Sequence, residues 1–186
     1  MLGLTLSDYG NISSILSFLV ACIATGMAFY IYRKWKEQQE YSIKINSLLD
    51  FGDKHVILMD RLFRDFSFFS NAHIAAKEAR GKDASYRKEI DDKIKKQSEG
   101  VLGGNPYGKV FFEYQLSYLR LKRVLADIDD MNGFEWLNPS KIDDFQKDFI
   151  SRSAVEGIQK EFSEKFIEIK ENGKESISSL EKKIKC

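Results

Sequence analysis

An apolar run without a charged residue, Ile12–Tyr32, constrains the fold of this chain more than any other feature. As an α-helix rising about 1.5 Å per residue, its 21 residues would cross the hydrocarbon core of a bilayer, which is about 30 Å thick. A helix satisfies its backbone hydrogen bonds internally, as lipid requires. We therefore expect a transmembrane helix at residues 12–32, after a short extracytoplasmic N-terminus at residues 1–11.

The charges that flank this run predict its orientation. Basic residues follow the run at once, whereas the residues before it include Asp8 and no Lys or Arg. Because cytoplasmic flanks carry the excess of basic residues, we expect the N-terminus outside and the C-terminus in the cytoplasm of a plasma (bacterial inner) membrane. A cleaved secretory signal is the competing interpretation, but it would begin with basic residues and have a shorter apolar core. The interface anchors that we expect are Tyr30, Tyr32, Arg33, Lys34, Trp35 and Lys36.

Small side chains recur every four residues within the apolar run, at Ser13, Ser17, Ala21 and Thr25. Such a stripe lets a second helix approach closely, so these residues are the candidates for association of membrane helices. No Gly-x-x-x-Gly motif accompanies them, and small residues are common in membrane helices generally. The association remains a hypothesis beside that alternative.

Composition narrows the classes of partner. The chain has 29 basic and 28 acidic residues, a net charge of +1, and no large region of one sign. Nucleic acid is therefore not an expected partner, since its recognition starts from a basic surface. The two cysteines, Cys22 and Cys186, form neither a disulfide framework nor a metal-ligand motif.

Beyond the apolar run, the periodicity is helical throughout. Residues 33–50 contain neither Pro nor Gly and predict a juxtamembrane helical stalk, which Gly52 would end or bend. Residues 53–186 predict a cytoplasmic helical domain. Its first helix would carry an apolar seam and stop at Gly81. The seam consists of Met59, Leu62, Phe66, Phe69, His73 and Ala76.

The rest of this domain predicts four further helical regions separated by turn residues. A charged surface helix occupies residues 82–98, and a glycine-rich loop follows at residues 100–108. A second core helix would run from about Phe111 to Asn132, and a long third one from Pro139 to Gly173, with a weak helix after it. The fold class is therefore all-α: a transmembrane helix, a stalk and a small helical bundle. A seam can also pair between chains, so an intermolecular coiled coil stays open.

Two lookalikes suggest chemistry that the surrounding sequence does not support. Residues 103–109 match the phosphate-binding pattern GxxxxGK, but Val110 replaces the Ser or Thr that binds magnesium, and no apolar strand precedes the motif. The two histidines, His55 and His73, are 18 residues apart and belong to no zinc motif. We expect His73 to be a core histidine and His55 to be solvated.

The sequence thus shows no recognisable catalytic constellation, and we expect no enzyme activity, no cofactor and no metal ligand. It predicts a single-pass, membrane-anchored helical protein that acts as a protein-interaction or assembly module. Its expected partners are the lipid bilayer and, through the cytoplasmic helices, either another copy of the chain or another protein. The alternative is a membrane-acting effector of the toxin or defence type, whose transmembrane helices assemble on a cytoplasmic trigger.

Overall fold

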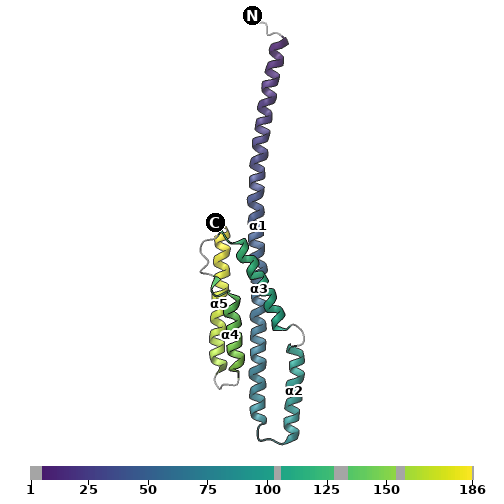
Figure 1. The fold of residues 1–186 in the computed structure, drawn as a ribbon, viewed down its shortest axis with the longest axis vertical. Helices are drawn as coiled ribbons and strands as arrows, with labels where there is room; N and C mark the ends of the chain where they lie inside the picture. The colour runs from purple at the N-terminus through teal and green to yellow at the C-terminus, as the bar shows by residue number, and fades with distance from the viewer. Residues whose placement is uncertain (1–5, 103–105, 128–133, 154–157, 186) are drawn as a thin grey trace. The chain divides into compact units, whose positions relative to one another are not determined.

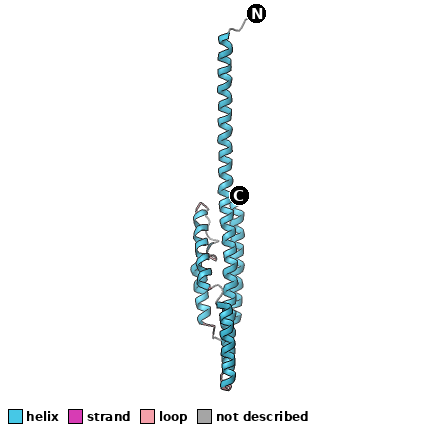
Figure 2. Cartoon of the chain, turned by 90° about the vertical axis from the view of Figure 1, so that its right-hand side faces the viewer, coloured by secondary structure: helices cyan, strands magenta, loops and turns pink. Residues whose placement is uncertain are grey.

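The computed structural model describes residues 6–102, 106–127, 134–153 and 158–185. These residues form helices and no strand, which confirms the predicted all-α fold. Figure 1 shows the helices in chain order, and Figure 2 shows that helix is the secondary structure of every long described segment. The helices are α1 (Leu6–Ala79), α2 (Ala84–Leu102), α3 (Tyr107–Val124), α4 (Pro139–Ser151) and α5 (Ile158–Lys185).

The chain divides into two compact units, residues 1–43 and residues 44–186. Near the N-terminus, α1 is long and apolar enough to span a membrane. Its most apolar window has a mean hydropathy of 2.1, and none of that window is buried. The second unit contains all of the buried hydrophobic residues that form the core.

Helix α1 does not end at Gly52, contrary to one of the two outcomes that the sequence suggested. A glycine inside a helix costs about 1 kcal/mol relative to alanine, and packing in the helical bundle easily offsets that cost. The helix does stop where Gly81 predicted. It ends at Ala79, and Gly81 takes the left-handed conformation, with a φ of 83°, that glycine adopts after a helix.

The core of the second unit is built from the C-terminal half of α1 together with α3, α4 and α5. On α1, buried side chains follow steps of three and four from Leu48 through Phe51 and Leu58 to Leu62. This spacing places them on one face, which is the face that packs against other helices. The predicted seam of α1 is buried at Met59, Leu62 and Phe66, but Phe69 and His73 are only half-buried and Ala76 is exposed.

Phenylalanine rings fill the part of this core where α1, α4 and α5 meet. Phe66 and Phe162 stack with their ring centroids 3.5 Å apart and an interplanar angle of 8°. Phe149 meets Phe162 edge-on at 5.2 Å, and Phe166 lies 5.6 Å from Phe162. Phe162, which is 2% exposed, therefore touches rings from three helices. Stacked and edge-to-face pairs of this kind add to the burial of apolar surface.

Helix α3 is a core helix, as its seam predicted. Tyr114 and Leu121 are fully buried, and Leu125, which follows the helix, is buried with them. The hydroxyl of Tyr114 donates a hydrogen bond of 2.6 Å to the carbonyl oxygen of Leu137. This bond satisfies the one polar group of a deeply buried ring and fixes the segment that leads into α4.

The predicted third helix, from Pro139 to Gly173, begins where expected, but its predicted continuity and its predicted end are wrong. It is interrupted after Ser151, and α5 then runs from Ile158 through Gly173 to Lys185. Asn138 and Pro139 start α4 as expected, since the Asn138 side chain accepts a hydrogen bond from the Ser140 N–H. Across the interruption, Arg152 makes two parallel bonds with Glu161, at 3.0 and 2.7 Å, which tie α4 to α5.

Helix α2 lies on the surface, as its charge pattern predicted. Asp83 caps it by accepting a hydrogen bond of 2.7 Å from the Tyr86 N–H. Tyr86 is 39% exposed, and Ile90 and Ile94 are half-buried. The side chains of residues 100–102 lie outside the described part, and the described residues of α2 contribute nothing to the buried core.

Candidate functional site

The small-residue stripe of the apolar segment coincides with a shallow groove on the surface of α1. Three of the four predicted residues, Ser13, Ser17 and Ala21, line this groove. Thr25 lies outside it, and its hydroxyl donates a hydrogen bond of 2.8 Å to the carbonyl oxygen of Ala21. The bulkier walls of the groove come from Ile12, Leu16 and Val20. Such a groove matches the surface that closely packed membrane helices share.

The predicted interface anchors lie at the end of the apolar segment and directly after it on the same helix, and they are exposed. The rings of Tyr32 and Trp35 lie 6.4 Å apart. Glu37 accepts hydrogen bonds from both Arg33 and Lys34, and the bond with Lys34 is the main cause that raises the pKa of that amine. These exposed pairs contribute little stability, and acidic residues weigh little in membrane orientation. The remaining anchors, Tyr30 and Lys36, are exposed as well.

Helix α3 presents a second apolar face that the sequence reasoning missed. Phe112, Leu116 and Leu119 lie at positions i, i+4 and i+7 and are 57%, 51% and 57% exposed. The opposite face of the same helix carries the buried Tyr114 and Leu121. These three residues are spaced by four and three positions, like the core residues of the same helix, so the sequence could have revealed this exposed stripe. Exposed apolar residues grouped on one helix face are typical of an interaction surface.

The second unit also buries an imidazole that the sequence reasoning placed in solvent. His55 is 2% exposed and lies beside the rings of Phe51 and Tyr114, at centroid distances of 6.4 and 5.8 Å. Neither of its nitrogens has a hydrogen-bond partner among the described residues. His73, expected in the core, is only half-buried. The histidine of the core is therefore His55 and not, as predicted, His73.

Gly173 accommodates this imidazole on the facing helix. A Cβ atom at Gly173 would lie 2.5 Å from Nε2 and 3.0 Å from Cε1 of His55, closer than real contacts allow. Alanine would suit the interior of α5 better by about 1 kcal/mol. A polar ring without a partner costs about another 1–3 kcal/mol. Two unfavourable residues thus meet at one point of the fold, which marks it as a candidate functional position.

Burial lowers the pKa of His55 from 6.5 to about 4, because the charged form is poorly solvated there. Below pH 6.5 the unfolded chain takes up a proton that the folded chain refuses, so stability falls as the pH drops towards 4. We expect His55 to contribute a loss of about 2 kcal/mol between pH 6.5 and about pH 5. Chemical unfolding of the wild type and of His55→Phe should show this loss in the wild type alone, and His73→Gln should retain it.

The second unit also places the Arg61–Asp65 ion pair and the Tyr107 hydroxyl out of contact with water. Arg61 and Asp65, one turn apart on α1, form an ion pair of 3.0 Å and are 8% and 3% exposed. Burial raises the pKa of Asp65, and Arg61 opposes that change. Burial also raises the pKa of the Tyr107 hydroxyl. Within the ion pair the opposite charges of Arg61 and Asp65 compensate each other.

The GxxxxGK lookalike does not have the surroundings of a phosphate-binding loop. Residues 103–105 lie outside the described residues, whereas Gly108 and Lys109 lie in the first turn of α3. The segment before them is the helix α2 instead of a strand. Val110 is 5% exposed and packs in the core. This geometry favours an interhelical connection.

Comparison of the chain with models of known protein families, with curated proteins and with solved structures finds no match. Three features of the chain itself bear on its function: the apolar segment with its groove, the exposed face of α3, and the buried His55.

Proposed function

We propose that this chain is a single-pass, membrane-anchored helical protein that acts as an interaction or assembly module without catalysis. In this proposal residues 12–32 cross a plasma membrane, the bacterial inner membrane in the simplest case. The basic residues Arg33, Lys34 and Lys36 keep the following part in the cytoplasm, because the positive-inside rule orients short flanks in this way. The second unit, residues 44–186, is then the cytoplasmic module.

The exposed face of α3 is the observation that carries the proposal. Phe112, Leu116 and Leu119 keep more than half of their surface exposed, although a soluble domain gains by covering such side chains. Apolar residues at i, i+4 and i+7 of one helix can insert together into a hydrophobic groove of a partner, so their spacing suits docking on another helical surface. Either a second copy of the chain or a different protein meets this requirement. Anchoring in a membrane would raise the local concentration of copies and assist the first of these.

In-cell cross-linking of the tagged full-length chain tests the proposal. We expect the wild type to give a defined cross-linked product, and the double variant Leu116→Gln/Leu119→Gln to lose it because the apolar face is gone. Ile167→Gln is the matched control, since Ile167 is an isolated apolar residue on α5 that is 58% exposed. A wild-type chain that gives no product, or a double variant that gives the same product, would contradict the proposal.

The groove at Ser13, Ser17 and Ala21 favours the second candidate, an effector whose membrane helices assemble. The same experiment separates the two. A ladder of self-cross-linked species that survives the α3 substitutions but disappears in Ser17→Leu/Ala21→Leu would favour this effector. Loss of membrane potential on overexpression of the wild type, absent in that variant, would then identify the bilayer as its target.

A further inference from the structure

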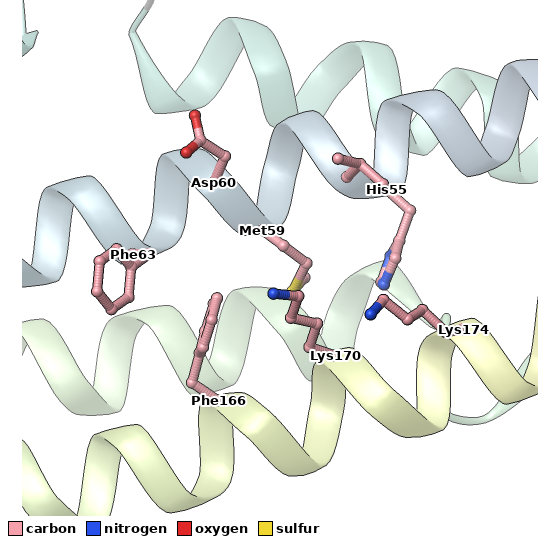
Figure 3. Close-up of a pocket in the computed structure, with 8 residues that line it drawn as sticks. His55, Met59, Asp60, Phe63, Phe166, Lys170 and Lys174 are labelled. Atoms are coloured by element: carbon pink, nitrogen blue, oxygen red, sulfur yellow. The ribbon is translucent and has the colours of Figure 1, made fainter.

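His55 forms the inner wall of a pocket between α1 and α5. The pocket has a volume of about 360 Å³, at the small end of the range for sites that bind small molecules. Figure 3 shows the imidazole directed from α1 towards α5, where Lys174 lies beside it. Both ring nitrogens lack a hydrogen-bond partner among the described residues. The ring thus brings a donor and an acceptor, both unused, to the pocket.

The floor and sides of the pocket are apolar. Met59 and Phe166 are buried, and Phe63, whose ring centroid lies 5.6 Å from that of Phe166, is about half exposed at the edge. Figure 3 shows the Phe63 and Phe166 side chains together at one end of the pocket, away from His55. An aromatic or aliphatic group would contact these side chains and remove their apolar surface from water.

The charged groups at the pocket favour an anion. Lys170 and Lys174, one turn apart on α5, both point towards α1, and Lys170 has no ion-pair partner among the residues that the structure describes (Figure 3). Lys174 pairs with Glu171 at 3.2 Å, and both side chains are more than half exposed. The one acid that lines the pocket, Asp60, is paired with Arg64 at 2.8 Å and points away from the lysines.

We propose that this pocket binds a small apolar monocarboxylate, aromatic or short-chain aliphatic. The carboxylate lies between the amines of Lys170 and Lys174 and accepts a hydrogen bond from His55, while the apolar part lies against Met59 and Phe166. Charge-assisted hydrogen bonds hold the carboxylate, which is the head of the ligand, and burial of apolar surface holds its apolar tail. Binding at this pocket is independent of the proposed function, because it involves other residues and does not require the chain to assemble.

The two histidines make the test direct, because labelling histidine with ¹³C gives one signal inside the pocket and one outside. The full-length chain in nonionic detergent micelles is titrated with phenylacetate and, separately, with hexanoate. We expect the Cε1–H signal of His55 to shift saturably with at least one of these acids while the His73 signal stays in place. A response to phenylacetate alone would select aromatic acids, and a response to hexanoate alone would select aliphatic ones.

Two controls examine the head and the tail of the ligand. Acetate lacks the apolar part and 2-phenylethanol lacks the charge, so both should bind more weakly than phenylacetate. Lys170→Gln/Lys174→Gln should weaken the binding at least about tenfold, since each lysine supplies a charge-assisted bond. Lys160→Gln, an exposed change elsewhere on α5, should not.

Three results would overturn the proposal. The first is a His55 signal that does not respond to either acid. The second is a shift of the His73 signal in parallel with that of His55, which would show an unspecific effect of the acid on the chain or the micelle. The third is equal binding of 2-phenylethanol, or unchanged binding by the double lysine variant, either of which would show that the lysines do not recognise a charge.

Discussion

Replacement of Phe162 by alanine is expected to lower the free energy of unfolding of the second unit, residues 44–186, by about 3–5 kcal/mol, the usual cost of truncating a buried phenylalanine. The reason is the position of this ring. It is 2% exposed, stacks on Phe66 at 3.5 Å and meets Phe149 edge-on at 5.2 Å. One substitution therefore leaves a cavity where three helices meet. Domains of this size are stable by only about 5–15 kcal/mol.

Circular dichroism during urea unfolding of the full-length chain in nonionic detergent measures this effect. Ile167→Ala is the matched control, because Ile167 lies on the same helix but is 58% exposed, and its truncation should change stability by no more than about 0.5 kcal/mol. Phe162→Leu should fall between the two, since it keeps most of the apolar volume. A loss below about 1 kcal/mol in Phe162→Ala would contradict the central role of the aromatic cluster.

The helical fold and the identity of most core residues could be predicted because both depend on local periodicity. The seams of α1 and α3 are periodic in the sequence. Asn138 caps the start of α4 with its side chain, and Gly81 follows the end of α1 in the left-handed conformation that glycine allows. Gly52 and Gly173 gave the wrong boundaries for a physical reason. A glycine allows a helix to end but does not require it, and tertiary packing decides between the two outcomes.

The role of Gly173 cannot be recognised from the residues around it in the sequence. Its lack of a side chain matters because His55, more than a hundred positions earlier in the chain, lies against it. The burial of His55 follows the same pattern, since the residue falls in the three-four spacing between Phe51 and Leu58 but is polar. Hydrophobic periodicity passes over a polar residue at a core position, so the pocket could not be predicted until α1 and α5 were placed together.

The membrane-helix candidates are a different case, because their positions depend on one helix alone. The sequence grouped Ser13, Ser17 and Ala21 correctly on one face, since positions four apart on a helix are neighbours. Thr25 shares the spacing of four residues with them. Because four residues make slightly more than one full turn of a helix, each member of the series is rotated relative to the one before, and Thr25 no longer faces the groove.

The second large effect is expected from charges placed inside the apolar segment. Leu19→Arg/Ile23→Arg should cost about 5–7 kcal/mol of membrane insertion, because each central arginine costs about 2.5–3.5 kcal/mol. Both positions are more than half exposed on the helix surface and lie outside the groove at Ser13, Ser17 and Ala21. The double variant should therefore lose its anchor while keeping the association face, and it should appear in the soluble fraction after alkaline carbonate extraction.

Glu37→Arg/Glu40→Arg is the control for the added charge. These residues follow the apolar segment, where they pair with Arg33, Lys34 and Lys36. Arginine at these positions strengthens the basic flank without entering the hydrocarbon core, so this variant should stay in the membrane pellet like the wild type. If the Leu19→Arg/Ile23→Arg variant also resisted extraction, residues 12–32 would not be the anchor. Membrane attachment would then have to come from the second unit, whose exposed apolar face on α3 would be the first surface to examine.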